Sequence, residues 1–168
     1  MGPKQLSVSH KQRERRQRGH DFQEEIRQSL RYVPNTWTIN ITDGKGGSRP
    51  ADRLIVTEHL NILTELKRTA GMRFNLEFLR PNQIQGLIDF DKVTERNLGL
   101  VFVSFHNPKR DLDEAYAFRL VTALQYMKNR DIRYLSIDDL RDKKVPVIEL
   151  PRINELYDLK GVINCKSL

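Results

Sequence analysis

Cysteine is nearly absent from this chain of 168 residues. The single Cys165 cannot form an internal disulfide, and the four histidines show no metal-ligand spacing with it. The sequence therefore argues against both a disulfide framework and a structural zinc site.

Long apolar runs are also missing, and no stretch approaches the length of a membrane span. The N-terminus is polar and basic, without the apolar core of a secretory signal. We therefore expect an intracellular, cytoplasmic protein with no membrane partner. No change of composition divides the chain, so we expect one folded domain over residues 19–168.

Acidic residues are outnumbered, 22 against 29 lysines and arginines, which gives a net charge of +7. A basic surface concentrates polyanions, so nucleic acid is the first partner to consider. Residues 4–18 alone hold six basic side chains against Glu14. We expect residues 1–18 to form a flexible basic arm that contacts DNA phosphates through Arg15, Arg16 and Arg18; the alternative is a solubilising tail.

Apolar spacing indicates a mixed α/β fold. A spacing of three and four residues predicts helices over 19–33 and 81–89, and alternation or short apolar runs predict strands over 37–42, 52–56, 62–67, 100–105 and 115–120. Short helices around Leu124 and Leu140 and a strand near Val147 follow. This order fits a central mixed sheet with helices on its faces.

The strands over 52–56 and 62–67 are predicted to form a hairpin, and the most informative residues, Asp52, Glu65 and Lys67, lie on its two arms. Because strand side chains alternate, Glu65 and Lys67 project to one side while Leu66 points into the core. Two converging carboxylates suit Mg²⁺ or Mn²⁺, and the nearby ammonium can orient a water or stabilise a phosphorane. The alternative is an ordinary ion pair on an exposed strand.

Pro50-Ala51-Asp52 followed by Glu65-Leu66-Lys67 resembles the PD-(D/E)xK nuclease superfamily. Residues 18–26 are similar to the opening helix of RecU-type and archaeal Hjc-type Holliday-junction resolvases, and residues 46–52 to the Ser-containing loop of the archaeal type. Residues 74–83 and 99–105 resemble the sequence of RecU-type enzymes that follows the active-site hairpin. The resemblance implies a restriction-endonuclease-like core and a metal-dependent endodeoxyribonuclease of DNA recombination and repair.

The chain departs from these families at the helix acid, because Gln23 stands where they place a glutamate. Glu24 is the nearer acidic substitute on the helix, Glu25 lies farther round, and Gln23 itself could ligate a metal through its amide oxygen. The segment before Asp52 is also too short for the RecU stalk, which favours the compact archaeal type.

Several other residues are candidates for DNA contact. Ser48, Lys45 and Arg49 lie in a glycine-rich loop that could approach a phosphate or serve only as a connector. Gln83 resembles the glutamine that borders such sites. Trp37 and Phe90 are expected in the core, whereas Phe74 and Phe78, with Arg68, Arg73 and Arg80, could stack on unpaired bases.

The leading hypothesis is a homodimeric endonuclease that nicks four-way DNA symmetrically, with a divalent metal and no small-molecule cofactor. The alternatives are a restriction-type or repair nuclease of the same superfamily, or a junction-binding protein that has lost cleavage.

Overall fold

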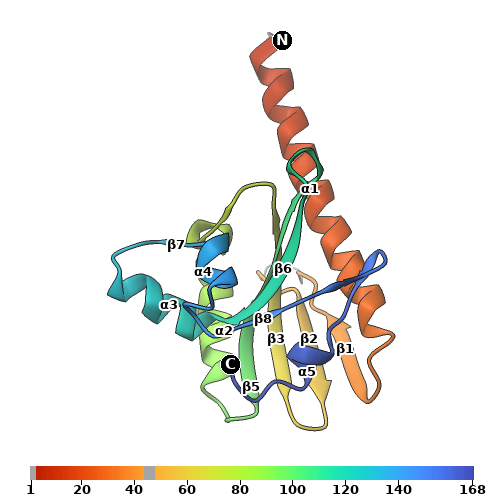
Figure 1. Ribbon diagram of the computed structural model, residues 1–168, viewed down its shortest axis with the longest axis vertical. Helices are drawn as coiled ribbons and strands as arrows, with labels where there is room; N and C mark the ends of the chain where they lie inside the picture. The colour runs from red at the N-terminus through yellow and green to blue at the C-terminus, as the bar shows by residue number, and fades with distance from the viewer. Residues whose placement is uncertain (1–2, 44–47) are drawn as a thin grey trace.

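A six-stranded mixed sheet organises the computed structural model, which describes residues 3–43 and 48–168, with side chains from residue 10 onward (Figure 1). The strand order is β1-β2-β3-β5-β6-β8. Only β3 and β5 pair in parallel among these neighbours in the described chain; the other pairs are antiparallel. The strands are β1 Thr36–Asn40, β2 Arg53–Thr57, β3 Asn61–Thr69, β5 Asn97–Asn107, β6 Leu112–Arg119 and β8 Val147–Glu149.

Helices cover both faces of the sheet. The first core cluster packs α1 (Pro3–Leu30) against the sheet through Phe22, Ile26, Ile62 and Leu66. The second packs α2 (Pro81–Asp91) and α3 (Leu120–Asn129) against the other face, where residues such as Leu63 and Leu87 are buried. The expected mixed α/β fold, with helices on both faces of a central sheet, is confirmed.

Short elements complete the fold. They are η1 Leu76–Phe78, η2 Pro108–Arg110, α4 Ile137–Arg141, α5 Lys160–Ile163, the pair β4 Arg73–Asn75 with β7 Tyr134–Ser136, and the pair β9 Arg152–Ile153 with β10 Leu156–Tyr157. Tyr157 stands edge-on to Phe22, with ring centroids 5.6 Å apart. The C-terminal segment therefore packs onto α1. In the part of the chain that the structure describes, no helix is long and apolar enough to cross a membrane.

The basic N-terminal segment is helical, not an irregular arm. Helix α1 runs without interruption through Gly19, the residue at which we expected it to begin. Lysine, arginine and glutamine are good helix formers, and after Pro3, at the helix start, residues 4–18 contain no proline or glycine to end a helix. Residues 10–17 are exposed, and Figure 1 shows this end of α1 projecting past the sheet.

Two aromatic assignments are corrected. Phe74, a candidate for base stacking, is completely buried and packs edge-on against Phe78 and Phe118 at 5.8 and 5.3 Å. Phe78 keeps 36% of its surface exposed. Trp37, expected in the core, is 58% exposed because it lies on β1, an edge strand of the sheet.

Close contact between α2 and β5 depends on Gly99. A Cβ atom at this position would lie 2.3 Å from the carbonyl oxygen of Leu87. We expect Gly99→Ala to lower the free energy of unfolding by about 1–3 kcal/mol, as overpacking does. Gly19→Ala is the matched control, since a Cβ there meets no atom within 4 Å. It should be neutral or stabilising in urea denaturation; equal stability of the two variants would refute the close approach.

Candidate active site

The hairpin of β2 and β3 brings Asp52 beside Glu65. Arg53 pairs with Thr64 in the register, and the Asp52 N–H donates to the Thr64 carbonyl at 3.1 Å. Asp52 Oδ2 in turn accepts a hydrogen bond of 2.9 Å from the Leu66 N–H. The carboxylate is therefore tied to the backbone of β3 at the residue that follows Glu65.

Glu65 and Lys67 lie on one face of β3, as the sequence predicted. Leu66 between them is buried in the core on the α1 side. Lys67 Nζ lies 2.7 Å from Glu65 Oε1. Glu65 is only 1% exposed, whereas 24% of the Lys67 side chain is accessible, so Lys67 is the member of this pair that a ligand can reach.

Gln83, on α2, is the second side chain that binds Glu65. Its Nε2 donates to Glu65 Oε1 at 2.6 Å, and its Oε1 accepts from the Arg80 N–H at 2.8 Å. The two bonds fix the orientation of the amide and connect the first turn of α2 to the glutamate. Gln83 is completely buried, so the alternative of a solvated helix residue does not hold.

Each carboxylate keeps an oxygen without a hydrogen bond. Glu65 Oε2 and Asp52 Oδ1 are buried and accept none in the described chain, although Asp52 Oδ1 forms an ion pair with Arg49 at 2.7 Å. Buried oxygens without donors are costly unless a cation or water satisfies them. The donor-free Oε2 of Glu65, with Oδ1 of Asp52 that only Arg49 contacts, fits Mg²⁺ or Mn²⁺, which take oxygen ligands and retain several waters.

The pKa of Glu65 is raised to about 7. Burial is the main cause, because it disfavours the charged form, and the negative charge of Asp52 adds to it. Lys67 and Arg49 act in the opposite direction. A carboxyl in this setting is poised to lose its proton when a cation binds beside it.

The third acidic ligand expected from the first helix is not at this site. The described residues contain no group of three Asp, Glu, His or Cys side chains suited to a metal. The reason is that Glu65 and Lys67 alternate with Leu66, which faces α1, so they project to the face that α2 covers. Gln23, half-buried on α1, forms no hydrogen bond with Asp52 or Glu65 in the described structure.

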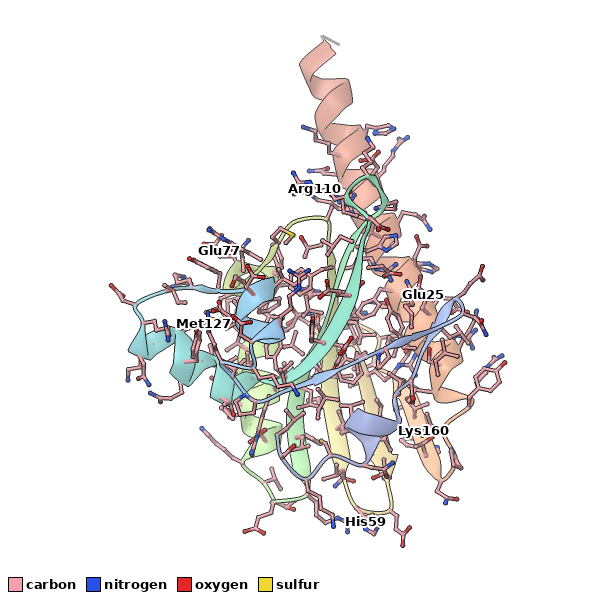
Figure 2. All side chains as sticks on the ribbon, viewed as in Figure 1. Glu25, His59, Glu77, Arg110, Met127 and Lys160 are labelled. Carbon is pink, nitrogen blue, oxygen red and sulfur yellow. The ribbon has the colours of Figure 1, made fainter. Side chains whose placement is uncertain are left out.

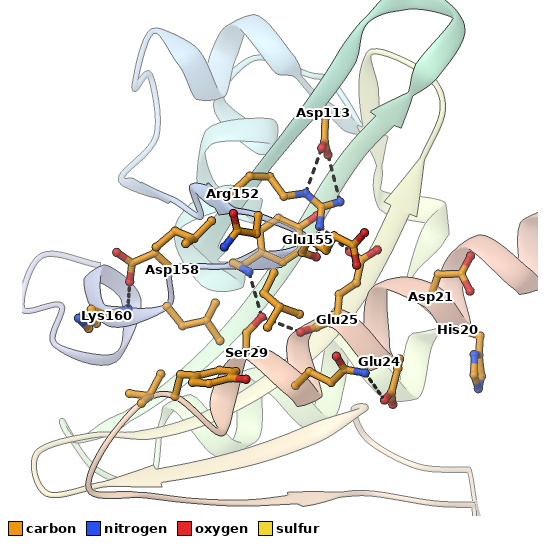
Figure 3. A pocket seen from close by; sticks show the side chains of 18 of the residues that line it. His20, Asp21, Glu24, Glu25, Ser29, Asp113, Arg152, Glu155, Asp158 and Lys160 are labelled. Atoms are coloured by element: carbon orange, nitrogen blue, oxygen red, sulfur yellow. Dashed lines mark hydrogen bonds and ion pairs between the residues drawn. The ribbon is translucent and has the colours of Figure 1, made fainter.

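Glu24 and Glu25 belong to a different cavity, of about 1400 Å³, between α1 and residues 152–160 (Figure 3). Glu24 accepts hydrogen bonds from Arg27 and Gln28, which lower its pKa to about 2. Glu25 forms ion pairs with Arg68 and Arg152. This cavity is not lined by Asp52, Glu65 or Lys67.

The candidate DNA-contact residues are scattered over the surface. Ser48 is exposed beside Arg49, and Lys45 lies outside the described residues. Four of the remaining candidates are exposed, namely Arg15, Arg16, Arg73 and Arg80, and Arg18 is half-buried.

Arg68 is the exception. Its side chain is 3% exposed and binds Glu25, Ser104 and Tyr157. Because the buried guanidinium is bound by side chains of the protein itself, Arg68 does not fit its expected role in DNA contact.

The raised pKa of Glu65 predicts a pH effect on stability. Folded protein holds this proton more tightly than unfolded protein, so between pH values of about 4.5 and 7 the free energy of unfolding falls as pH rises. Glu65→Gln removes this component. Urea denaturation with a chelator, at about pH 5 and about pH 8, should show a smaller pH difference in the variant. An identical pH difference in both proteins would contradict the burial argument.

Comparison with known proteins adds a distant structural similarity. No protein-family model matches the chain, and no curated protein matches it. Among solved structures, the chain is similar to Archaeoglobus fulgidus Hjc, described as a Holliday junction resolvase from an archaeal hyperthermophile. The identity is 12% and the TM-score is 0.37, and the match covers 52% of this chain and 66% of that chain.

Proposed function

We propose that this protein is a metal-dependent DNA endonuclease that resolves four-way junctions as a homodimer. The observation that carries the proposal is the setting of Glu65. It is a buried carboxyl beside Asp52 that is held by Lys67 at 2.7 Å and Gln83 at 2.6 Å and has one oxygen free. Such an arrangement is costly for stability alone, and it suits hydrolysis of a phosphodiester.

Each residue has a defined part in the proposed reaction. Asp52 and Glu65 would hold Mg²⁺ or Mn²⁺, which supplies Lewis acidity toward the phosphodiester when bound. Lys67, partly open to solvent, donates hydrogen bonds that orient the attacking water or neutralise charge on the phosphoryl oxygens. The water oxygen bonds to phosphorus and gives up a proton to solvent, while one phosphorus–oxygen ester bond breaks and the leaving oxygen takes up a proton to become a hydroxyl group. Gln83 acts through Glu65 and is a positioning residue.

DNA capture is ascribed to the basic surface. The exposed part of α1 presents Lys11, Arg13, Arg15 and Arg16 on a helix that projects past the sheet (Figure 1). Arg49 is 26% exposed and forms an ion pair with Asp52, so it would be the first cation that a phosphate meets at the site. Phosphate contacts of this kind give affinity without sequence preference.

The choice of four-way junctions depends on the sequence resemblance at residues 18–26 and 46–52. A homodimer follows from the two-fold symmetry of such a substrate, which requires two active sites in one particle. A restriction-type or repair nuclease would use the same residues on linear duplex. A protein that only binds junctions would keep the fold and cleave nothing.

A nicking assay with Mg²⁺, on a synthetic four-way junction and on linear duplex, separates these possibilities. We expect the parent to cut the junction, and Asp52→Asn, Glu65→Gln and Lys67→Ala each to lose on the order of 100-fold or more in rate. The variants should bind the junction nearly as well as the parent.

Glu77→Gln is the matched control for removal of an acid. Glu77 is exposed on η1, labelled in Figure 2, and its side chain forms no hydrogen bond or ion pair with Asp52, Glu65 or Lys67 in the described chain. It should cut at the parental rate. Parental cleavage by Asp52→Asn or Glu65→Gln would refute the site, preference for linear duplex would refute the resolvase, and no cleavage by the parent would leave junction binding as the function.

A further inference from the structure

A second cavity, of about 490 Å³, lies between the end of α1 and the strands β1 and β2. Three arginines line it: Arg27, Arg31 and Arg53. Its other polar lining comes from Thr36, Thr38 and Asn40, and no acidic residue contributes among the described residues. The cavity is therefore cationic, and its walls carry hydrogen-bond donors.

Arg53 is the unusual member of this set. It is 3% exposed, and its guanidinium donates to Thr38 Oγ1 at 2.9 Å and to Asn40 Oδ1, both uncharged acceptors. Its Nε is buried without a hydrogen bond. No carboxylate among the described residues forms an ion pair with it, and the residues whose side chains are not described, 1–9 and 44–47, include no Asp or Glu.

In the described part of the chain, no ion pair compensates this buried charge. Burial and the positive charge of Arg27 lower the pKa of Arg53, and Asp52 and Glu24 offset only part of this. Arg27 is neutralised by Glu24, whereas Arg31 is exposed and forms no ion pair in the described chain. Arginine is almost never fully buried unless it is paired, because an unpaired charge in the interior is expensive. The described residues that line the cavity therefore provide no negative charge of their own.

We propose that this cavity binds a phosphate group, held by Arg53 and Arg31 with hydroxyl and amide donors from β1. Guanidinium groups match the geometry of phosphate oxygens, and the ion would supply the missing countercharge.

The cavity lies on the α1 face of the sheet, because Arg53 alternates with Asp52 along the chain. A phosphate held there is therefore not the one that Glu65 and Lys67 face. Its assignment to a flanking phosphodiester of DNA depends on the proposed function. Binding of free phosphate does not depend on it.

The competing interpretation is that Arg53 only joins β1 to β2 through Thr38 and Asn40. The two interpretations predict opposite results for Arg53→Met, which keeps much of the volume and removes the charge. If the charge of Arg53 is compensated only when an anion binds, the variant should be at least as stable as the parent in chloride buffer. The reason is that apolar replacement of a poorly compensated buried charge is often neutral or stabilising. If Arg53 is a structural link, the variant should be less stable.

The test is titration of inorganic phosphate against chloride at equal ionic strength, followed by the melting temperature and by calorimetry. Phosphate should stabilise the parent, and Arg53→Met and Arg31→Gln should each weaken its binding by about tenfold. Arg31→Gln changes an exposed residue and so keeps the test valid if Arg53→Met does not fold. Arg130→Gln is the matched control; it removes an exposed arginine at the end of α3, across the molecule from β1 (Figure 1).

A second arm measures binding of a four-way junction without divalent metal, so that cleavage plays no part. If DNA supplies the phosphate, Arg53→Met and Arg31→Gln should lower affinity and reduce the slope of its salt dependence by about 1, and Arg130→Gln should not. Loss of phosphate binding with unchanged DNA binding would identify free phosphate as the ligand. Parental phosphate binding by both variants would overturn the proposal, whatever the nicking assay shows.

Discussion

The buried carboxyl group of Glu65 is the constraint on which the rest of the site depends. The group is 1% exposed, and Lys67 and Gln83 both bind one of its oxygens, which offsets part of the cost of burying it. Gln83 reaches it from α2, so the position of that helix on the sheet sets the geometry of the site. Two close approaches fix that position: a Cβ on Gly86 would meet Pro50 at 2.5 Å, and one on Gly99 would meet Leu87 at 2.3 Å.

The sheet separates two kinds of charge. Asp52, Glu65 and Lys67 face α2, whereas Arg53 and the arginines at the end of α1 lie on the opposite face. This division follows from strand alternation, which sends neighbours such as Asp52 and Arg53 to opposite sides. The β2–β3 hairpin therefore carries a carboxylate site on one face and a cationic cavity on the other. Each contains a buried group whose charge is only partly compensated: Glu65 in the first and Arg53 in the second.

Local patterns were enough to predict the hairpin, helix α2 and the shared face of Glu65 and Lys67, because alternation and turn residues act over a few positions. Features set by long-range packing were not predictable. Helix α1 faces Leu66 and not Glu65, which removes Glu24 from the site, and the burial of Gln83 and Arg53 depends on partners many residues away. The basic run was expected to form a flexible arm, although its residues favour a helix.

The most direct measurement is calorimetric titration of Mn²⁺ into the parent and into Asp52→Asn, Glu65→Gln and Glu24→Gln. If Asp52 and Glu65 form the metal site without an acid from α1, the first two variants should lose Mn²⁺ binding. Glu24→Gln should bind as the parent does, because Glu24 is held by Arg27 and Gln28 at another cavity. Parental Mn²⁺ binding by Asp52→Asn, or loss of binding in Glu24→Gln, would contradict this account of the site.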